Sequence, residues 1–132
     1  MWLPDQVIGR VKFLAWASLV SQILIIGTGG AVRLTESGLG CPTWPRCTEE
    51  SFVSTPEMGF HGIIEFGNRL LTFVLIIIAL GMFLMVVRMR KERPELLRLS
   101  IALGLGIPAQ AIIGGITVLT DLNPYVVGLH YL

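Results

Sequence analysis

Long apolar stretches separated by short polar ones dominate the chain. Uncharged runs cover about residues 13–32 and 99–119, and each is close to the roughly 20 residues that a helix needs to cross membrane hydrocarbon. A longer run over about residues 58–87 contains two ionisable groups, Glu65 and Arg69, and is long enough to cross with tilt. The pattern predicts an all-α integral membrane bundle with three complete transmembrane helices.

A fourth apolar stretch covers residues 124–132 and stops with the chain at Leu132. It is too short to cross a bilayer, so we interpret it as the start of a fourth helix and expect the chain to be truncated there. Proline and polar residues mark two helix starts, at Thr55-Pro56-Glu57 and at Asn123-Pro124.

Basic residues predict the orientation of these helices. Lys and Arg are scarce in the connections after the first and third helices and common before the first helix and between the second and third, at Arg10, Lys12, Arg88, Arg90, Lys91, Arg93 and Arg98. The positive-inside rule then places the N-terminus in the cytoplasm and a cysteine-containing loop, residues 35–55, outside. No Arg-rich, Ser-rich leader precedes the first helix, which favours a prokaryotic cell membrane.

Composition excludes an ordinary soluble domain. Hydrophobic residues make up 53% of the chain and charged residues 14%, with a mean hydropathy of +0.73, whereas soluble domains have about 25% charged residues. The formal charge of +1 and the lack of a basic motif with interleaved aromatics exclude nucleic acid as a partner. Membrane lipid is the expected surrounding.

The chain has two histidines, His61 and His130, and both fall in the outer part of a predicted helix. Each follows a helix-starting proline by five or six residues, roughly 8–9 Å along the axis. Two imidazoles at one depth between helices are suited to axial ligation of haem iron. The alternative is that each is an interfacial histidine hydrogen-bonded to a carbonyl or to water.

Glu65 and Asn68 extend the helix face that begins at His61, and a carboxylate within lipid indicates a functional site. Two interpretations are open. Arg69 follows Glu65 by four residues, so the two can neutralise each other as a structural pair. In the other, Arg69 or Arg33 holds an anionic group such as a propionate, and Glu65 is free to move protons.

Two cysteines, Cys41 and Cys47, lie in the predicted outer loop. On the oxidising side of a membrane, this pair predicts a disulfide. A structural crosslink and exchange with another thiol system are both open roles.

The helix before this loop and the third helix both end in the pattern G-G-x-x-x-L-T, at residues 29–35 and 114–120, which suggests an internal repeat of helix pairs.

Three segments resemble the haem A synthase family, which takes part in cytochrome oxidase assembly. They are GGAVRLTESGLGCPTWPRC (residues 29–47), HGIIEFGNRL (residues 61–70) and GGITVLTDLNPYVVGLH (residues 114–130). The resemblance covers nearly the whole chain. It implies that the chain is the N-terminal half of an eight-helix protein built from two four-helix bundles.

The resemblance also implies an activity, the oxidation of a methyl group of haem O to the formyl group of haem A. Haem O is then the substrate in this half, and a haem b is expected in the C-terminal half. Glu65 matches the family's essential glutamate, His130 a histidine ligand, and Cys41 and Cys47 its outer cysteine pair. Expected partners are haem O synthase, oxidase assembly factors and a second copy of the chain.

One residue departs from the family pattern. The family commonly has Glu-x-x-His-Arg where this chain has Glu65-Phe66-Gly67-Asn68-Arg69, and an amide is a poor haem ligand. Either His61 binds the iron in its place, or His130 binds it alone. Two other functions stay open: a non-catalytic haem-binding or electron-transfer module, and a purely structural bundle. We expect the fragment alone to be inactive, because its bundle lacks one wall.

Overall fold

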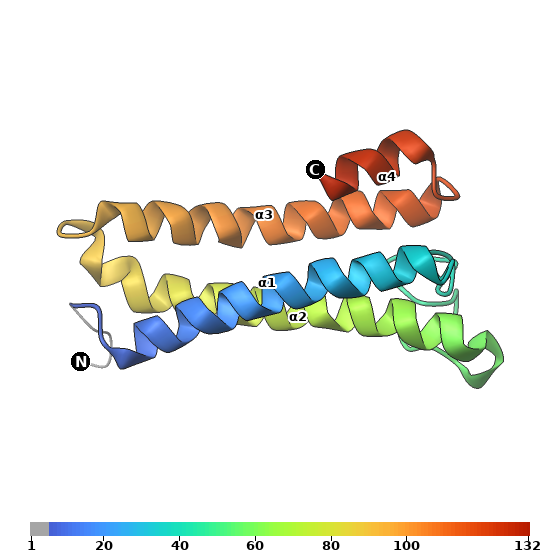
Figure 1. The fold of residues 1–132 in the computed structure, drawn as a ribbon, viewed down its shortest axis with the longest axis horizontal. Helices are drawn as coiled ribbons and strands as arrows, with labels where there is room; N and C mark the ends of the chain where they lie inside the picture. The colour runs from blue at the N-terminus through green and yellow to red at the C-terminus, as the bar shows by residue number, and fades with distance from the viewer. Residues whose placement is uncertain (1–5) are drawn as a thin grey trace.

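The computed structural model describes residues 6–132, and this part of the chain is helical apart from its loops and turns (Figure 1). The predicted all-α class is confirmed. The elements are α1 (Gly9–Leu34), η1 (Pro56–Met58), α2 (Gly59–Val86), η2 (Val87–Arg90), α3 (Pro94–Leu119) and α4 (Pro124–Tyr131), where η denotes a short 3-10 helix.

Helix starts follow the predicted chemistry. Pro56 occupies the first position of η1 after Thr55, and Pro124 occupies the first position of α4. The Asn123 side chain caps α4 by accepting a hydrogen bond from the backbone N–H of Tyr125 at 3.0 Å. These caps satisfy backbone donors that would otherwise be unpaired at the end of a helix.

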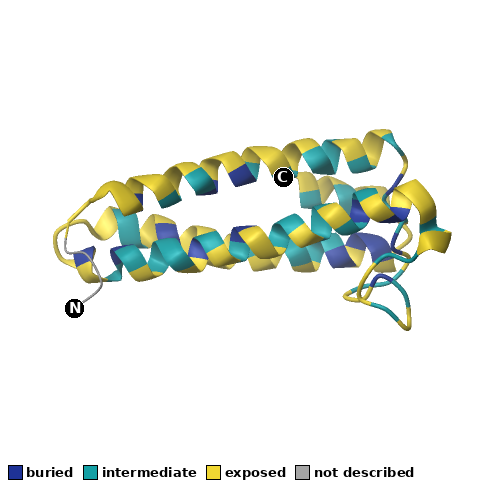
Figure 2. Ribbon diagram, turned by 90° about the horizontal axis from the view of Figure 1, so that it is seen from below, coloured by how far each residue is buried: buried dark blue, intermediate teal, exposed yellow. Residues whose placement is uncertain are grey.

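Within the described residues, three helical segments are long and apolar enough to cross a membrane: Gly9–Leu34, Pro56–Arg90 and Pro94–Leu119. Much of the surface of these helices consists of exposed residues (Figure 2), and many of them are large and apolar. Trp16 is 67% exposed, Phe73 63% and Ile77 68%. An exposed apolar surface of this extent is suited to contact with lipid.

Each helix packs on the next one along the chain: α1 on α2, α2 on α3, and α3 on α4. Among the described residues, neither α1 and α3 nor α2 and α4 pack directly on each other. Figure 1 shows the start of α1 and the α2–α3 connection at one end of the bundle, and the long α1–α2 loop and the α3–α4 turn at the other. The predicted cysteine loop and both histidine-bearing helix segments therefore share one end.

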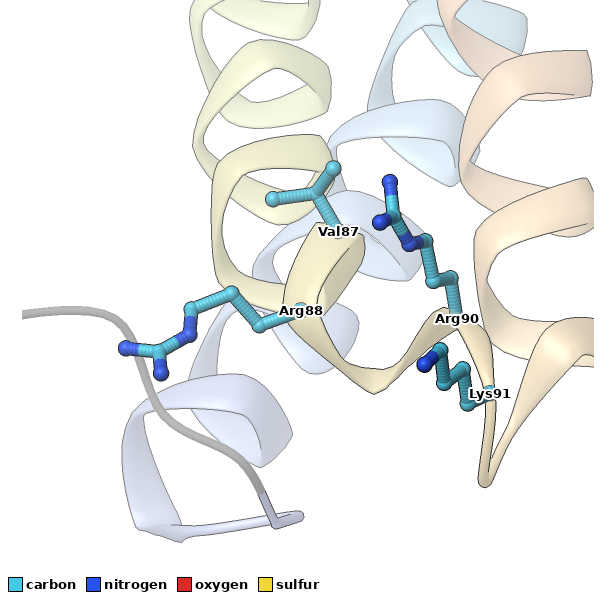
Figure 3. Close-up of a pocket in the computed structure, with 4 residues that line it drawn as sticks. All are labelled: Val87, Arg88, Arg90 and Lys91. Carbon is cyan, nitrogen blue, oxygen red and sulfur yellow. The ribbon is translucent and has the colours of Figure 1, made fainter.

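The opposite end carries a shallow basic pocket at η2, lined by Val87, Arg88, Arg90 and Lys91 (Figure 3). Arg88 extends to one side of η2, whereas Arg90 and Lys91 lie on the other side. A small apolar core of Val11, Val86 and Met89 closes this end of the bundle. The residues predicted to be cytoplasmic are thus separated from the cysteine loop by the length of the helices.

Candidate functional site

The α1–α2 loop folds back over the first turns of α2 and is closed by a disulfide between Cys41 and Cys47. Both cysteines are almost fully buried, at 0% and 1% exposure. The Trp44–Pro45 peptide bond within the ring is cis. Because thiol exchange needs an accessible sulfur, this burial favours a structural crosslink over exchange with another thiol system.

Glu65 is buried beneath this loop, with 5% of its surface exposed. Its Oε2 accepts a hydrogen bond from the backbone N–H of Cys41 at 2.7 Å, and its Oε1 accepts one from Arg69 at 2.5 Å. A buried carboxylate is costly unless it is paired and hydrogen-bonded. Both oxygens of Glu65 have such partners, so the predicted pairing with Arg69 is formed.

Arg69 binds both Glu65 and the loop. Its Nη1 donates to the backbone carbonyls of Thr43 at 2.8 Å and Arg46 at 3.1 Å, and its Nη2 donates to that of Cys41 at 3.0 Å. The planar guanidinium is suited to several acceptors at fixed angles. In this arrangement Arg69 fixes the disulfide ring over α2 and is not directed toward a separate anion.

His61 lies in the first turn of α2, next to the end of α1. Its Nδ1 is 2.8 Å from the hydroxyl oxygen of Ser37, and the residue is exposed. At Gly40 the loop lies against the same turn, so closely that a Cβ at this position would overlap the backbone carbonyl of His61. A close approach of this kind needs glycine.

His130 packs on α3. A Cβ added to Gly114 would lie 2.9 Å from Cε1 of the imidazole, so only glycine leaves room for the ring. The Nδ1 of His130 is buried and has no hydrogen-bond partner among the described residues. The backbone of Gln110 on α3 also interacts with this imidazole.

Tyr131 joins α4 to α1. Its hydroxyl donates to the carbonyl of Gly29 at 2.9 Å, and the Arg33 guanidinium lies 5.8 Å from the centroid of its ring. Arg33 is therefore near the end of α4 that carries His130. The two Gly-Gly pairs of the suggested repeat have different environments: Gly29 supplies a carbonyl, whereas Gly114 makes room for a ring.

Asn68 faces α1. Its Oδ1 accepts a hydrogen bond from the hydroxyl of Thr28 at 2.7 Å. Hydrogen bonds of this kind between transmembrane helices stabilise their association. The carbonyl of this amide is thus already occupied in packing α2 against α1.

Three residues of the site were missed by sequence reasoning: Thr28, Ser37 and Trp44. The Trp44 ring lies directly over Gly115 of α3, where a Cβ would overlap the indole. The loop thereby connects α2, through Arg69, with α3, through Trp44. Only Thr28 carried a sequence signal, as a polar residue within an apolar helix, and that signal did not identify its partner.

The structure brings His61, Glu65, Arg69 and the two cysteines together at the N-terminal end of α2. His130 and Arg33 lie at the same end of the bundle but on α4 and α1, and α4 does not pack on α2 (Figure 1). No cluster of three or more His, Cys, Asp or Glu side chains suited to a metal ion occurs in the part of the chain that the structure describes.

Comparison with known proteins identifies the family. A family model for COX15-CtaA, described as cytochrome oxidase assembly protein, matches residues 12–132. The chain belongs to this family. No solved structure matches it.

Relatives within the COX15-CtaA family share about a third or less of their residues with the chain. It is 30% identical to a protein named "Heme A synthase" from Geobacillus thermodenitrificans over 95% of its own length and 38% of that protein's. It is 33% identical to a "Heme A synthase" from Lysinibacillus sphaericus over 92% of its length and 39% of that protein's. The corresponding protein of Geobacillus kaustophilus is 28% identical over 92% and 38%. The chain therefore spans about two fifths of the length of these relatives.

Proposed function

We propose that the chain serves haem A biosynthesis, as part of an enzyme that oxidises the methyl group of haem O to a formyl group. The relatives named "Heme A synthase" align along nearly all of the chain, and this alignment carries the proposal. The site supports it with groups that suit a haem substrate and proton movement. Such an enzyme is an oxidoreductase and works within the membrane.

The two histidines fit a haem. His61 is exposed in the first turn of α2, and the buried Nδ1 of His130 has no partner in the described part of the chain. The helices that carry them, α2 and α4, are not packed against each other. Imidazole is the usual protein ligand of haem iron, and we assign His61 and His130 as the ligand candidates.

Asn68 is the weaker candidate, because its carbonyl already accepts a hydrogen bond from Thr28. Arg33 lies beside Tyr131 at the end of α4 and is the arginine suited to hold a propionate, since Arg69 is bound to the loop. Bound iron would supply the redox chemistry. The chain's own residues would orient the substrate, and the Glu65 carboxylate would be the group that accepts and returns a proton.

The experiment is extraction and mass identification of haems from the chain, purified in detergent from a host that makes haem O. His61→Ala and His130→Ala are compared with Tyr125→Phe, a control at an exposed residue of α4. We expect haem O or haem A in the wild type and the control, and its loss in the histidine variants. Haem that persists in both histidine variants would exclude the proposed ligands.

A non-catalytic haem-binding module is the second candidate, because the histidines support it equally well. The two functions differ in what they require of Glu65, because only the enzyme needs its carboxylate for the conversion of haem O. For topology, we propose a multi-pass protein of the cell membrane with the disulfide loop outside and the basic pocket at η2 in the cytoplasm. Haem O synthase and oxidase assembly factors are the proposed partners.

A further inference from the structure

A chain of hydrogen bonds runs from the last turn of α1 to His61. The Thr35 hydroxyl donates to the backbone carbonyl of Ala31 at 2.8 Å. The hydroxyl oxygens of Thr35 and Ser37 are 2.7 Å apart, and that of Ser37 is 2.8 Å from Nδ1 of His61. Ser37 has no exposed surface, so its hydroxyl does not exchange these partners for water.

The direction of each hydrogen bond follows from counting protons. A carbonyl only accepts, and a hydroxyl has one proton, so Thr35 uses its proton on Ala31. Thr35 must then accept at its contact with Ser37. If all of these contacts are hydrogen bonds, Ser37 donates its single proton to the Thr35 hydroxyl, near which the Thr35 backbone carbonyl lies 3.4 Å from the Ser37 oxygen. This arrangement, which keeps all three contacts as hydrogen bonds, leaves Ser37 as an acceptor toward His61 and makes Nδ1 the donor.

We propose that the Thr35–Ser37 hydroxyl pair is a positioning device that holds His61 with its proton on Nδ1 and its Nε2 lone pair free to bind haem iron. This rests on the proposed function for the identity of the ligand. A neutral imidazole has one N–H and one lone pair, so fixing the proton on Nδ1 leaves Nε2 as the ligand atom. Histidine ligands generally donate their second N–H to an acceptor in this way, which orients the ring and raises its basicity.

The backbone around Ser37 fixes the hydroxyl in place. Its N–H donates to the carbonyl of Val32 at 2.8 Å, and its carbonyl accepts from the N–H of Gly40 at 2.9 Å. Gly40 in turn lies against the backbone of His61. The segment from Ser37 to Gly40 therefore holds the Ser37 hydroxyl and the His61 backbone in fixed positions relative to each other. A preorganised ligand requires such support.

His130 differs in this respect. Its Nδ1 is buried without a hydrogen bond of good geometry in the described residues, although the backbone of Gln110 interacts with the imidazole. Asn68 is the weaker candidate for the role, because its Oδ1 already accepts a hydrogen bond from Thr28. The geometry thus distinguishes His61 from Asn68 as the iron ligand of α2.

The test is the tautomer of His61 in the haem-free chain, measured by long-range proton–nitrogen NMR correlations after labelling histidine with 15N. The chain has two histidines, so His130→Gln assigns both spectra. We expect the Nδ1-protonated form for wild-type His61 and loss of this preference in Ser37→Ala. Ser100→Ala is the matched control, because Ser100 is a buried serine on α3 whose hydroxyl has no partner in the described residues.

Thr35→Val provides a second variant that keeps Ser37. It removes the hydroxyl that accepts the Ser37 proton and leaves only the backbone carbonyl of residue 35, at 3.4 Å, as an acceptor. Ser37 can then donate to His61, and we expect the proton of the imidazole to move to Nε2. A wild-type His61 protonated on Nε2, or a tautomer unchanged in both Ser37→Ala and Thr35→Val, would overturn the hydrogen-bond chain. An unchanged His130 spectrum in each variant shows that the fold is retained.

Haem titration of the same proteins separates this inference from the proposed function. In the wild type, an absorption spectrum typical of imidazole-bound iron is expected, with its bands shifted in Ser37→Ala and restored in Ser37→Thr. If the tautomer is as proposed but His61→Ala binds haem with an unchanged spectrum, the ligand role fails while the hydrogen-bond chain stands. If His61 binds haem whichever of its ring nitrogens carries the proton, the proposed role of the Thr35–Ser37 hydrogen bonds fails and the proposed function stands.

Discussion

The backbone N–H of Cys41 donates to the carboxylate of Glu65 across 2.7 Å, and this hydrogen bond joins the disulfide loop to the buried acid of α2. Arg69 completes the connection by binding Glu65 and three loop carbonyls. The candidate acid and the loop therefore form one unit, and a change in one is expected to displace the other.

Glu65→Gln tests the role of the acid. A glutamine still offers an oxygen to the N–H of Cys41 but cannot hold or release a proton at the pH of the cell. We expect conversion of haem O to haem A to fall by about 10²–10⁴-fold, the usual contribution of a positioned acid or base, while haem content is unchanged. The measurement is haem analysis of membranes from cells that make the intact protein.

Glu50→Gln is the control, because Glu50 is an exposed residue of the same loop. A wild-type rate of conversion in Glu65→Gln would contradict the catalytic role and leave Glu65 as half of a structural pair. Loss of haem together with activity would indicate that the carboxylate is needed to maintain the site.

Arg69→Lys tests whether the shape of the guanidinium, beyond its charge, holds the loop. A lysine ammonium cannot reach the carbonyls of Cys41, Thr43 and Arg46 in the geometry that Arg69 uses. Losing one hydrogen bond to a charged group costs about 1.5–3 kcal/mol, so hydrogen exchange of the loop amides should accelerate at least about tenfold. Mass spectrometry of exchange in loop peptides measures this.

The same substitution at Arg33 is the control. Its guanidinium lies over the ring of Tyr131 and makes no hydrogen bond to the disulfide ring, so Arg33→Lys should leave loop exchange unchanged. Equal exchange in wild type and Arg69→Lys would show that the disulfide alone determines the position of the loop.

The disulfide should resist reduction in the folded chain, because the Cys41 and Cys47 side chains are buried. We expect no alkylation after mild dithiothreitol in detergent and complete alkylation once the chain is denatured. Replacing both cysteines by serine should reduce the free energy of unfolding by about 2 kcal/mol, the chain-entropy estimate for so short a loop. Rapid labelling of the folded protein would instead support a role in thiol exchange.

Much of the fold was predictable because it depends on local patterns. Apolar runs long enough to cross a membrane marked the three long helices, and the Asn123 cap followed from residue type and spacing. The Glu65–Arg69 pair was also predictable, since residues four apart share one helix face.

The tertiary part of the site was not predictable in this way. Ser37 meets His61 and Thr28 meets Asn68 across 24 and 40 positions of the chain. Hydrophobic periodicity identifies which face of a helix is polar but not which residue meets it. The return of the loop over α2 depends on Gly40 and Arg69 together, and neither predicts it alone.

Gly115→Ala tests the contact between the loop and α3. A Cβ at Gly115 would overlap the Trp44 ring, so the loop or the helix must move, and overpacking of this kind costs about 1–3 kcal/mol. Gly104→Ala is the matched control on the same helix, because no atom lies within 4 Å of the added Cβ. There, alanine should be neutral or stabilising by up to about 1 kcal/mol. Thermal unfolding in detergent, followed by circular dichroism, gives the comparison.

Trp44→Ala completes a double-mutant cycle with Gly115→Ala. If the clash is with the indole, removing the ring should recover most of the stability that Gly115→Ala loses, and the two effects should be strongly non-additive. Additive losses would mean that Gly115 is required for another reason, such as backbone flexibility of α3. In that case Trp44 would not connect the disulfide loop to the helix on which His130 packs.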